Sequence, residues 1–271
     1  MNMAGLSLMQ RTRGCAQVTL RQRDGVARLE RLYQSGSAKA MLPNVHRATP
    51  EIVFLNTSGG LTGGDRLRFE LTLGDGVRAM ATTQTAERAY ASAGGVANVD
   101  VALSVGAGGR LDWLPQETIL FDRSALHRRT VVEMAADASV LLVEMLVLGR
   151  AAMGERVGVL DLTDWREVRR GGIPVLVEPL RLTGASLQGQ AGLLGSARAV
   201  ASVALISPGA EAMLVPVRAA LVDPAVDAGA SAWGGKCVVR LLATEALPLR
   251  QALVKVLQVM RGGPLPRVWQ I

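Results

Sequence analysis

Alternation of apolar and polar residues with a period of two is the strongest pattern along this chain. In residues 66–73, every second residue is leucine or phenylalanine, and the residues between them are charged or threonine. Such alternation is typical of a strand with one face in a hydrophobic core. Similar patterns cover residues 77–83, 98–105, 130–134, 173–177 and 237–243. The sequence therefore predicts a mostly β protein.

Glycine clusters separate these expected strands, at residues 74–76, 94–95, 106–109 and 171–172. Glycine accepts the positive φ that hairpin turns demand. Neighbouring strands are therefore expected to pair antiparallel in many places.

Residues 249–260 have the period of an amphipathic helix, because apolar residues recur three and four positions apart. Pro248 suits its first turn, and Gly262 suits its C-terminal end. A second short helix is expected at about residues 83–92. Composition does not change abruptly along the chain, so we expect one domain over residues 1–271, with residues 1–15 as a candidate disordered segment.

Composition limits the classes of function. Hydrophobic residues make up 49% of the chain and the mean hydropathy is +0.26, which is enough apolar material for a core. The longest apolar stretch, residues 138–149, contains Glu144 and is too short to span a membrane. The N-terminus shows no export signal, so we expect a cytoplasmic protein without a membrane partner.

Charge favours basic residues modestly, with 30 Lys and Arg against 23 Asp and Glu. The densest basic runs, residues 11–31 and 123–129, are interleaved with apolar residues at strand spacing. We interpret them as solvated strand faces. A basic nucleic-acid-binding β domain is the alternative hypothesis, and the lack of aromatic residues among the basic ones counts against it.

Motifs for catalysis or cofactor binding are weak. The glycine-rich residues 59–64 are followed by Asp65 rather than by the Lys-Ser/Thr pair of a phosphate loop. Ser231 and His127 are the best candidates for a cryptic hydrolase, but neither lies in a convincing motif. The two cysteines, Cys15 and Cys237, and the two histidines have no zinc-site spacing, so we expect both cysteines to be buried.

Five phrases in a fixed order carry more information than any single motif. They are LNTSGGLTGGD at 55–65, TTQTAERAY at 82–90, LPQETILF at 114–121, LGR with GE between 148 and 155, and PRVW at 266–269. Together they resemble the UreD family of urease accessory proteins, called UreH in some organisms. The resemblance extends from about Gln17 to Trp269.

The resemblance implies a non-catalytic assembly factor with no tightly bound cofactor. Such a protein binds apo-urease and UreF, reaches the GTPase UreG through UreF, and helps deliver nickel, which is in transit. It also implies an elongated, helix-like stack of β-strands in two layers, with a C-terminal amphipathic helix and one short internal helix. From the charge pattern above, we expect no nucleic-acid partner.

The family is thought to use polar residues along an internal route for nickel, and the matching positions are Asp65, Thr82, Thr83, Glu144 and Glu155. Oxygen ligands bind a hydrated nickel ion weakly enough to release it. Each position also has a structural interpretation: Asp65 as the cap of the glycine turn, the threonines as helix caps, and Glu155 as a partner of Arg150. Val143 departs from the family, which commonly has an aromatic residue there.

Overall fold

The computed structural model describes residues 11–44, 49–188 and 193–270, and the strands of this part form two sheets. The first sheet has seven strands, in the order β14 (Ile173–Thr183), β13 (Leu160–Arg170), β11 (Ser124–Met134), β8 (Ala97–Val105), β5 (Arg66–Leu73), β1 (Arg13–Arg23) and β2 (Val26–Gly36). The second has ten, in the order β16 (Asp227–Trp233), β17 (Lys236–Ala243), β15 (Ala199–Ile206), β12 (Ser139–Leu148), β9 (Arg110–Leu114), β6 (Arg78–Thr83), β4 (Glu51–Asn56) and β3 (Ala38–Met41), with β10 (Thr118–Leu120) between β12 and β7 (Glu87–Ala89).

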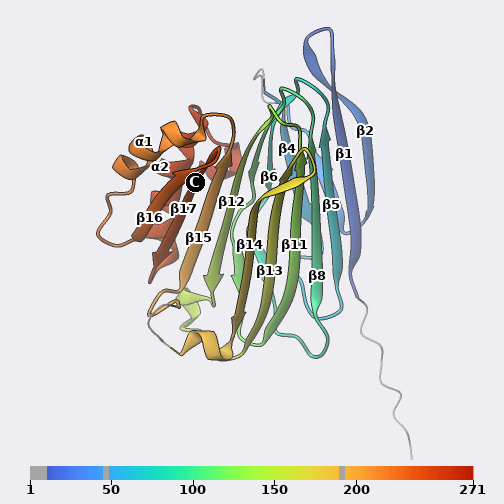
Figure 1. Cartoon of the computed structure of the whole chain (residues 1–271). Helices are drawn as coiled ribbons and strands as arrows, with labels where there is room; N and C mark the ends of the chain where they lie inside the picture. The colour runs from blue at the N-terminus through green and yellow to red at the C-terminus, as the bar shows by residue number, and fades with distance from the viewer. Residues whose placement is uncertain (1–10, 45–48, 189–192, 271) are drawn as a thin grey trace, which may run out of the picture.

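The chain passes back and forth between the two sheets, which makes a β-solenoid of about four turns (Figure 1). In the first sheet β5, β8, β11 and β13 are parallel neighbours, and in the second β4, β6, β9 and β12 are. The two-layer stack of strands implied by the family resemblance is confirmed.

The expectation of frequent antiparallel pairing is wrong for the central strands. Antiparallel pairs occur only toward the two ends of the solenoid among the described strands, as in β1–β2 and β13–β14. The glycine segment 74–76 joins β5 of one sheet to β6 of the other, and Gly76 has a positive φ of 67°. A glycine turn thus reverses the chain without fixing which strand becomes the neighbour.

The alternation in the strands places apolar side chains between the sheets. In β5 and β8 every second side chain is buried, as the sequence predicts. Phe54 packs against Phe69 and Trp113, with ring centres 5.2 Å and 5.8 Å away. This core separates the sheets, so any polar side chain on an inward position must find a partner there.

Two helices, α1 (Leu214–Ala220) and α2 (Ala246–Arg261), pack beside the outer face of the second sheet (Figure 1). The helix expected at 249–260 is confirmed, and Gly262 ends it in the left-handed conformation. Short 3-10 turns complete the list, at Ala151–Met153, Gly184–Leu187, Ala210–Met213 and Arg267–Trp269.

The short internal helix is α1, whereas the helix expected at residues 83–92 is absent. There β6 continues to Thr83, and β7 pairs with β10 as a parallel strand. Of the candidate disordered segment, residues 1–10 lie outside the described residues, and β1 begins at Arg13. Among the described residues no helix has the length and apolar character to cross a membrane.

Candidate functional site

Charged side chains occupy inward positions of β11 and β13, where the alternation would otherwise place apolar ones. In β11, Arg128 follows Leu126 on the buried face of the strand. In β13, Asp164 and Arg166 follow Leu162 on the corresponding face. Because β11 and β13 are parallel and Arg128 pairs with Asp164 in their register, the two charges are direct neighbours.

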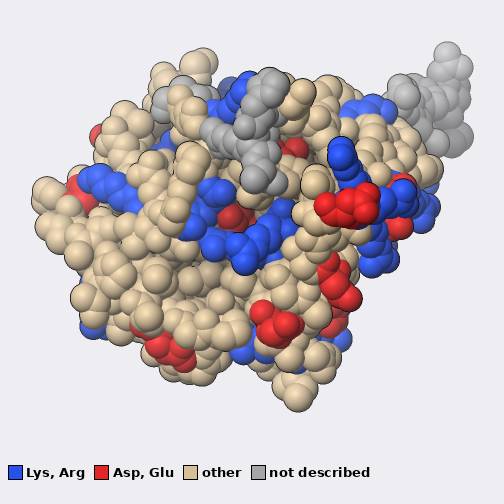
Figure 2. All heavy atoms as spheres, turned by 90° about the horizontal axis from the view of Figure 1, so that it is seen from above, with Lys and Arg blue, Asp and Glu red and all other residues tan. Residues whose placement is uncertain are grey.

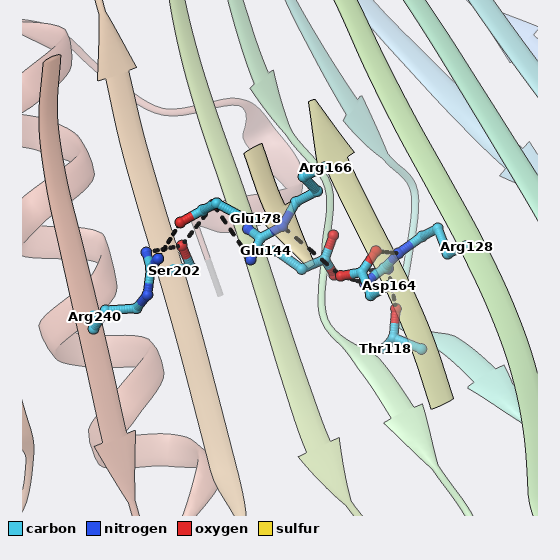
Figure 3. A network of polar contacts seen from close by, with 8 residues as sticks. All are labelled: Thr118, Arg128, Glu144, Asp164, Arg166, Glu178, Ser202 and Arg240. Carbon is cyan, nitrogen blue, oxygen red and sulfur yellow. Dashed lines mark hydrogen bonds and ion pairs between the residues drawn. The ribbon is translucent and has the colours of Figure 1, made fainter. Parts of the chain in front are cut away.

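Arg128 joins the two sheets through three hydrogen-bonding partners (Figure 3). Its Nε and Nη2 donate to the two carboxylate oxygens of Asp164 at 3.0 Å and 2.9 Å. Its Nη1 lies 2.7 Å from Oε1 of Glu144 in β12 and donates to Oγ1 of Thr118 at 3.0 Å. The side chains of Arg128, Glu144 and Asp164 are only 10%, 6% and 0% exposed, so this is a fully interior ion cluster.

The cluster continues across the interior to the surface near β17. Arg166 Nη2 lies 3.5 Å from Oε2 of Glu178 in β14. Glu178 also binds Arg240, which donates a 2.7 Å hydrogen bond to Oγ of Ser202. The side chain of Arg240 is 54% exposed, so polar groups extend without interruption from the core to solvent (Figure 3).

Burial and neighbouring charges set the protonation of this cluster. Burial raises the pKa of Glu144 to about 7, although the guanidinium of Arg128 opposes the shift. Burial also acts to raise the pKa of Asp164, but Arg128 outweighs it and holds that pKa below its ordinary value. Asp164 is therefore the fixed anion that compensates Arg128, and Glu144 is the carboxyl that can gain or lose a proton near neutral pH.

Two cavities lie next to each other, and the inner one adjoins the cluster. The inner cavity has a volume of about 50 Å³, and its walls include Gln116, Thr118, Arg128 and Glu144. The outer cavity has a volume of about 60 Å³, and its walls include the exposed residues 84, 85 and 88. Each space exceeds the roughly 10–15 Å³ that one water requires by this measure.

The two cavities share part of their lining, namely Phe69, Thr83 and Glu87. Around the inner cavity, Nε2 of Gln116 is buried and lacks a hydrogen-bond partner among the described residues. Unsatisfied buried groups of this kind commonly bind ordered water. The wall of the inner cavity is mostly apolar, with Phe69, Val101 and Trp113 among its residues, and a few polar side chains give water places to bind.

Thr83 and Glu144 are the sequence-predicted site residues that the structure brings together, because both line the inner cavity. Thr82 points elsewhere, and its Oγ1 donates to the carbonyl of Leu114 at 2.6 Å. The proposed helix-capping role of the two threonines is wrong, since no helix follows them.

Asp65 and Glu155 make structural contacts away from both cavities. Asp65 accepts hydrogen bonds from the backbone N–H groups of Thr12 and Thr62, both at 2.8 Å, which confirms its capping of the glycine turn. Glu155 lies 2.8 Å from Nε of Arg150, as the alternative interpretation expected. That hydrogen bond lowers the pKa of Glu155.

Sequence reasoning missed the cavity residue Glu87 and five charged residues of the cluster, which are Arg128, Asp164, Arg166, Glu178 and Arg240. The basic run 123–129 was interpreted as a solvated face, and Arg128 corrects that interpretation. A signal was present in the sequence. Arg128 lies two residues after the buried Leu126, and side chains two residues apart in a strand point to the same face.

The other functional candidates find little support in the geometry. Ser231 is in β16 of the second sheet and His127 is in β11 of the first, so they do not form a nucleophile and base pair. Cys237 is buried as expected, but Cys15 is only half-buried, and His46 lies outside the described residues. The described residues contain no group of three or more Cys, His, Asp or Glu side chains arranged to hold a metal ion.

Arginines on the face shown in Figure 2, which looks down on the upper strand ends of Figure 1, lie beside acidic side chains. A hollow of this molecule is lined by Arg78, Arg110, Arg261 and Asp112. Nε of Arg110 and Nε of Arg261 lie 3.1 Å and 2.7 Å from the two carboxylate oxygens of Asp112. This mixture of charges differs from the continuous basic surface that nucleic-acid binding requires.

Comparison with known proteins gives consistent matches over nearly the whole chain. The profile of the family described as UreD urease accessory protein matches residues 12–270. A protein of Cereibacter sphaeroides named urease accessory protein UreD is 58% identical, with 97% of this chain and 96% of that protein covered. Proteins of the same name from Dinoroseobacter shibae and Rhizobium etli are 53% and 44% identical, with 97% of this chain and 94% and 96% of those proteins covered.

Proposed function

Because this chain belongs to the UreD family of urease accessory proteins, and so takes part in urease maturation without being an enzyme, we propose that nickel passes through the cavities between its two sheets. Nickel is cargo in this function and is not retained. The partners implied by the resemblance, apo-urease, UreF and, through UreF, UreG, belong to the same proposal, as does the cytoplasmic location.

The observation that carries this proposal is the pair of adjoining cavities beside a buried ion cluster. Thr83, Thr118 and Glu144, which carry oxygen atoms, line the inner cavity, and the space is large enough for water. Hydroxyl and carboxylate oxygens are hard ligands that hold a hydrated divalent cation loosely. A short stay and a rapid release are what a conduit requires.

Arg128 constrains how a cation travels along this path. Its positive charge would repel a divalent cation strongly in a low-dielectric interior if it were uncompensated. Asp164 and Glu144 compensate it. Nickel is therefore expected to pass as a hydrated ion beside Thr83 rather than in contact with Arg128.

Asp65, Thr82 and Glu155 enter the proposal as supports of the path rather than as its lining. The hydrogen bond from Thr82 fixes Leu114, directly before two residues, Pro115 and Gln116, that line the inner cavity. Asp65 and Glu155 accept hydrogen bonds from the backbone N–H groups of Thr62 and Arg150, and each holds the loop in which it lies.

The test is co-expression of variants with urease and its accessory proteins, followed by measurement of nickel per urease active site. Glu144→Ala and Thr83→Lys are expected to lower nickel content and urease activity while the chain still co-purifies with UreF. Thr72→Lys is the matched control, since Thr72 lies on the outward face of β5. Alanine at Asp65 or Glu155, and lysine at Thr82, are expected to act through stability and to reduce co-purification as well.

Full nickel content in both Glu144→Ala and Thr83→Lys would overturn the proposed path. A loss of nickel in Thr72→Lys equal to that in Thr83→Lys would also contradict it, because the effect would then not depend on the cavity.

A further inference from the structure

Glu87 lies where the inner and outer cavities meet. It is the first residue of β7, a three-residue strand next to β10, and its side chain lines both cavities. Thr83 shares this position, and the outer cavity opens beyond them beside exposed residues 84 and 85. The two cavities are therefore separated only by a shared wall, and Glu87 is its charged member.

Glu87 differs from the other carboxylate of these cavities in having no ion-pair partner within the described residues. Its oxygens accept long hydrogen bonds of 3.4 Å and 3.3 Å from Nδ2 of Asn56 and one of 3.1 Å from the backbone N–H of Arg88. Glu144, in contrast, contacts the guanidinium of Arg128. The two acids of the path are therefore not equivalent.

Glu87 is a half-buried carboxylate without an ion pair, and the charges of Arg88 and Arg128 act on it only from a distance. Burial raises its pKa to about 7, against the lowering effect of the Asn56 hydrogen bond. A carboxylate in such surroundings gains more from an approaching cation than an exposed one does, because water has already been removed from it. Glu144 gains less, since Arg128 already provides the positive charge.

We propose that Glu87 is a transient binding site for a hydrated divalent cation at the junction of the two cavities. This inference rests on the proposed nickel path and identifies the residue that draws the ion into it. One carboxylate, the Thr83 hydroxyl and water molecules form the ligand set. A set with a single charged ligand binds weakly, which suits an ion that must move on.

The test uses Glu87→Gln, which keeps the size of the side chain and removes its charge. The full chain is co-expressed with urease and its accessory proteins at limiting nickel, and nickel per urease active site is measured. We expect about a tenfold loss, as for the removal of a modest binding interaction, and recovery when nickel is raised. Glu51→Gln is the matched control, because Glu51 is a buried acid of β4 outside both cavities.

A second measurement does not depend on urease. The melting temperature of the purified complex of this chain with UreF is measured with and without millimolar Ni²⁺. Wild type and Glu51→Gln are expected to show the same cation-dependent rise, and Glu87→Gln a smaller one. If Glu87→Gln does not assemble, Glu87→Asp replaces it, with a reduced rise expected because the shorter carboxylate is withdrawn from the junction.

The possible outcomes separate this inference from the proposed function. If Thr83→Lys lowers nickel content but Glu87→Gln equals wild type in both measurements, the site at Glu87 is wrong and the path stands. If neither variant lowers nickel content, both fail. If Glu87→Gln or its aspartate replacement loses nickel content or the cation-dependent rise while Glu51→Gln does not, the site is supported.

Discussion

Nη1 of Arg128 lies 2.7 Å from Oε1 of Glu144, so one guanidinium connects the first sheet to the second inside the solenoid. The same side chain holds Asp164 through two hydrogen bonds. Buried charges of this kind stabilise a fold only as a complete set, because the removal of one partner leaves an uncompensated charge in the core.

Arg128→Met is therefore expected to lower the free energy of unfolding by about 3–5 kcal/mol, as found when one partner of a buried ion pair is lost. Urea denaturation measures the change. Arg129→Met is the control, since the neighbouring Arg129 side chain is 57% exposed. Equal stability of the two variants would show that the cluster contributes no net stability.

Glu87 gives a prediction for the pH dependence of stability. Its pKa is about 7 in the folded chain against an ordinary value of 4.5, so the folded state retains a proton that the unfolded state releases between these values. Stability from this group is present at low pH and is lost as pH rises toward 7. Glu87→Gln cannot titrate. Its melting temperature should therefore fall less than that of wild type between about pH 5 and pH 8, and parallel curves would contradict the raised pKa.

Leu253→Asp tests the packing of α2 on the second sheet. Leu253 is fully buried, and a carboxylate there would lack a partner. We expect a loss of about 3 kcal/mol in the free energy of unfolding. Gln251→Asp places the same side chain on the exposed face of the same helix and should change stability little. A melting curve of Leu253→Asp like that of wild type would show that this face of α2 does not pack against the second sheet.

Trp269 anchors the end of the chain to the rest of the fold. Its Nε1 donates to the carbonyl of Leu114 at 2.9 Å, and the guanidinium of Arg250 lies 4.7 Å from its ring centre. Trp269→Ala is expected to cost about 3–5 kcal/mol, measured by chemical denaturation. Trp233→Ala removes a 52% exposed tryptophan and should cost far less.

Exposed apolar residues on the edge strand β2 predict association of the isolated chain. Leu29, Leu32 and Tyr33 are 46%, 41% and 47% exposed, and one edge of β2 has no neighbouring strand among those described. Such edges favour association between copies. Light scattering should show aggregates of the isolated chain, fewer aggregates after Leu29→Lys, and rescue by UreF. A monodisperse chain unaffected by UreF would contradict this prediction.

The sequence predicts local structure well where one pattern decides it. The alternation at residues 66–73 coincides with β5, and the apolar period at 249–260 lies within α2. The strand partners do not follow from such patterns, because a period of two identifies the buried face but not the neighbour. The helix expected at 83–92 failed for the same reason: its residues form β7 only because β10 lies beside them.

The site was predicted only in part. Thr83 and Glu144 were identified through the family resemblance, whereas Arg128 and Asp164 were not. Their proximity depends on the stacking of β11 against β13, which residue spacing alone does not reveal. The alternation of strand faces would have placed Arg128 on the buried face. A charged residue two positions from a buried apolar one is the simplest sign that a charge in this chain is interior.

The order of the cluster residues along the chain has a consequence for synthesis on the ribosome. Arg128, Glu144, Asp164 and Glu178 come from β11, β12, β13 and β14 in that order. A nascent chain that ends before β13 holds Arg128 without its bidentate partner, so its last strands have a reason to stay loosely docked. Emergence of β13 supplies the missing carboxylate and β14 extends the cluster through Glu178. The interior therefore closes fully only when β13 and β14 have been added. A truncated chain would keep an uncompensated arginine and would not adopt the finished structure.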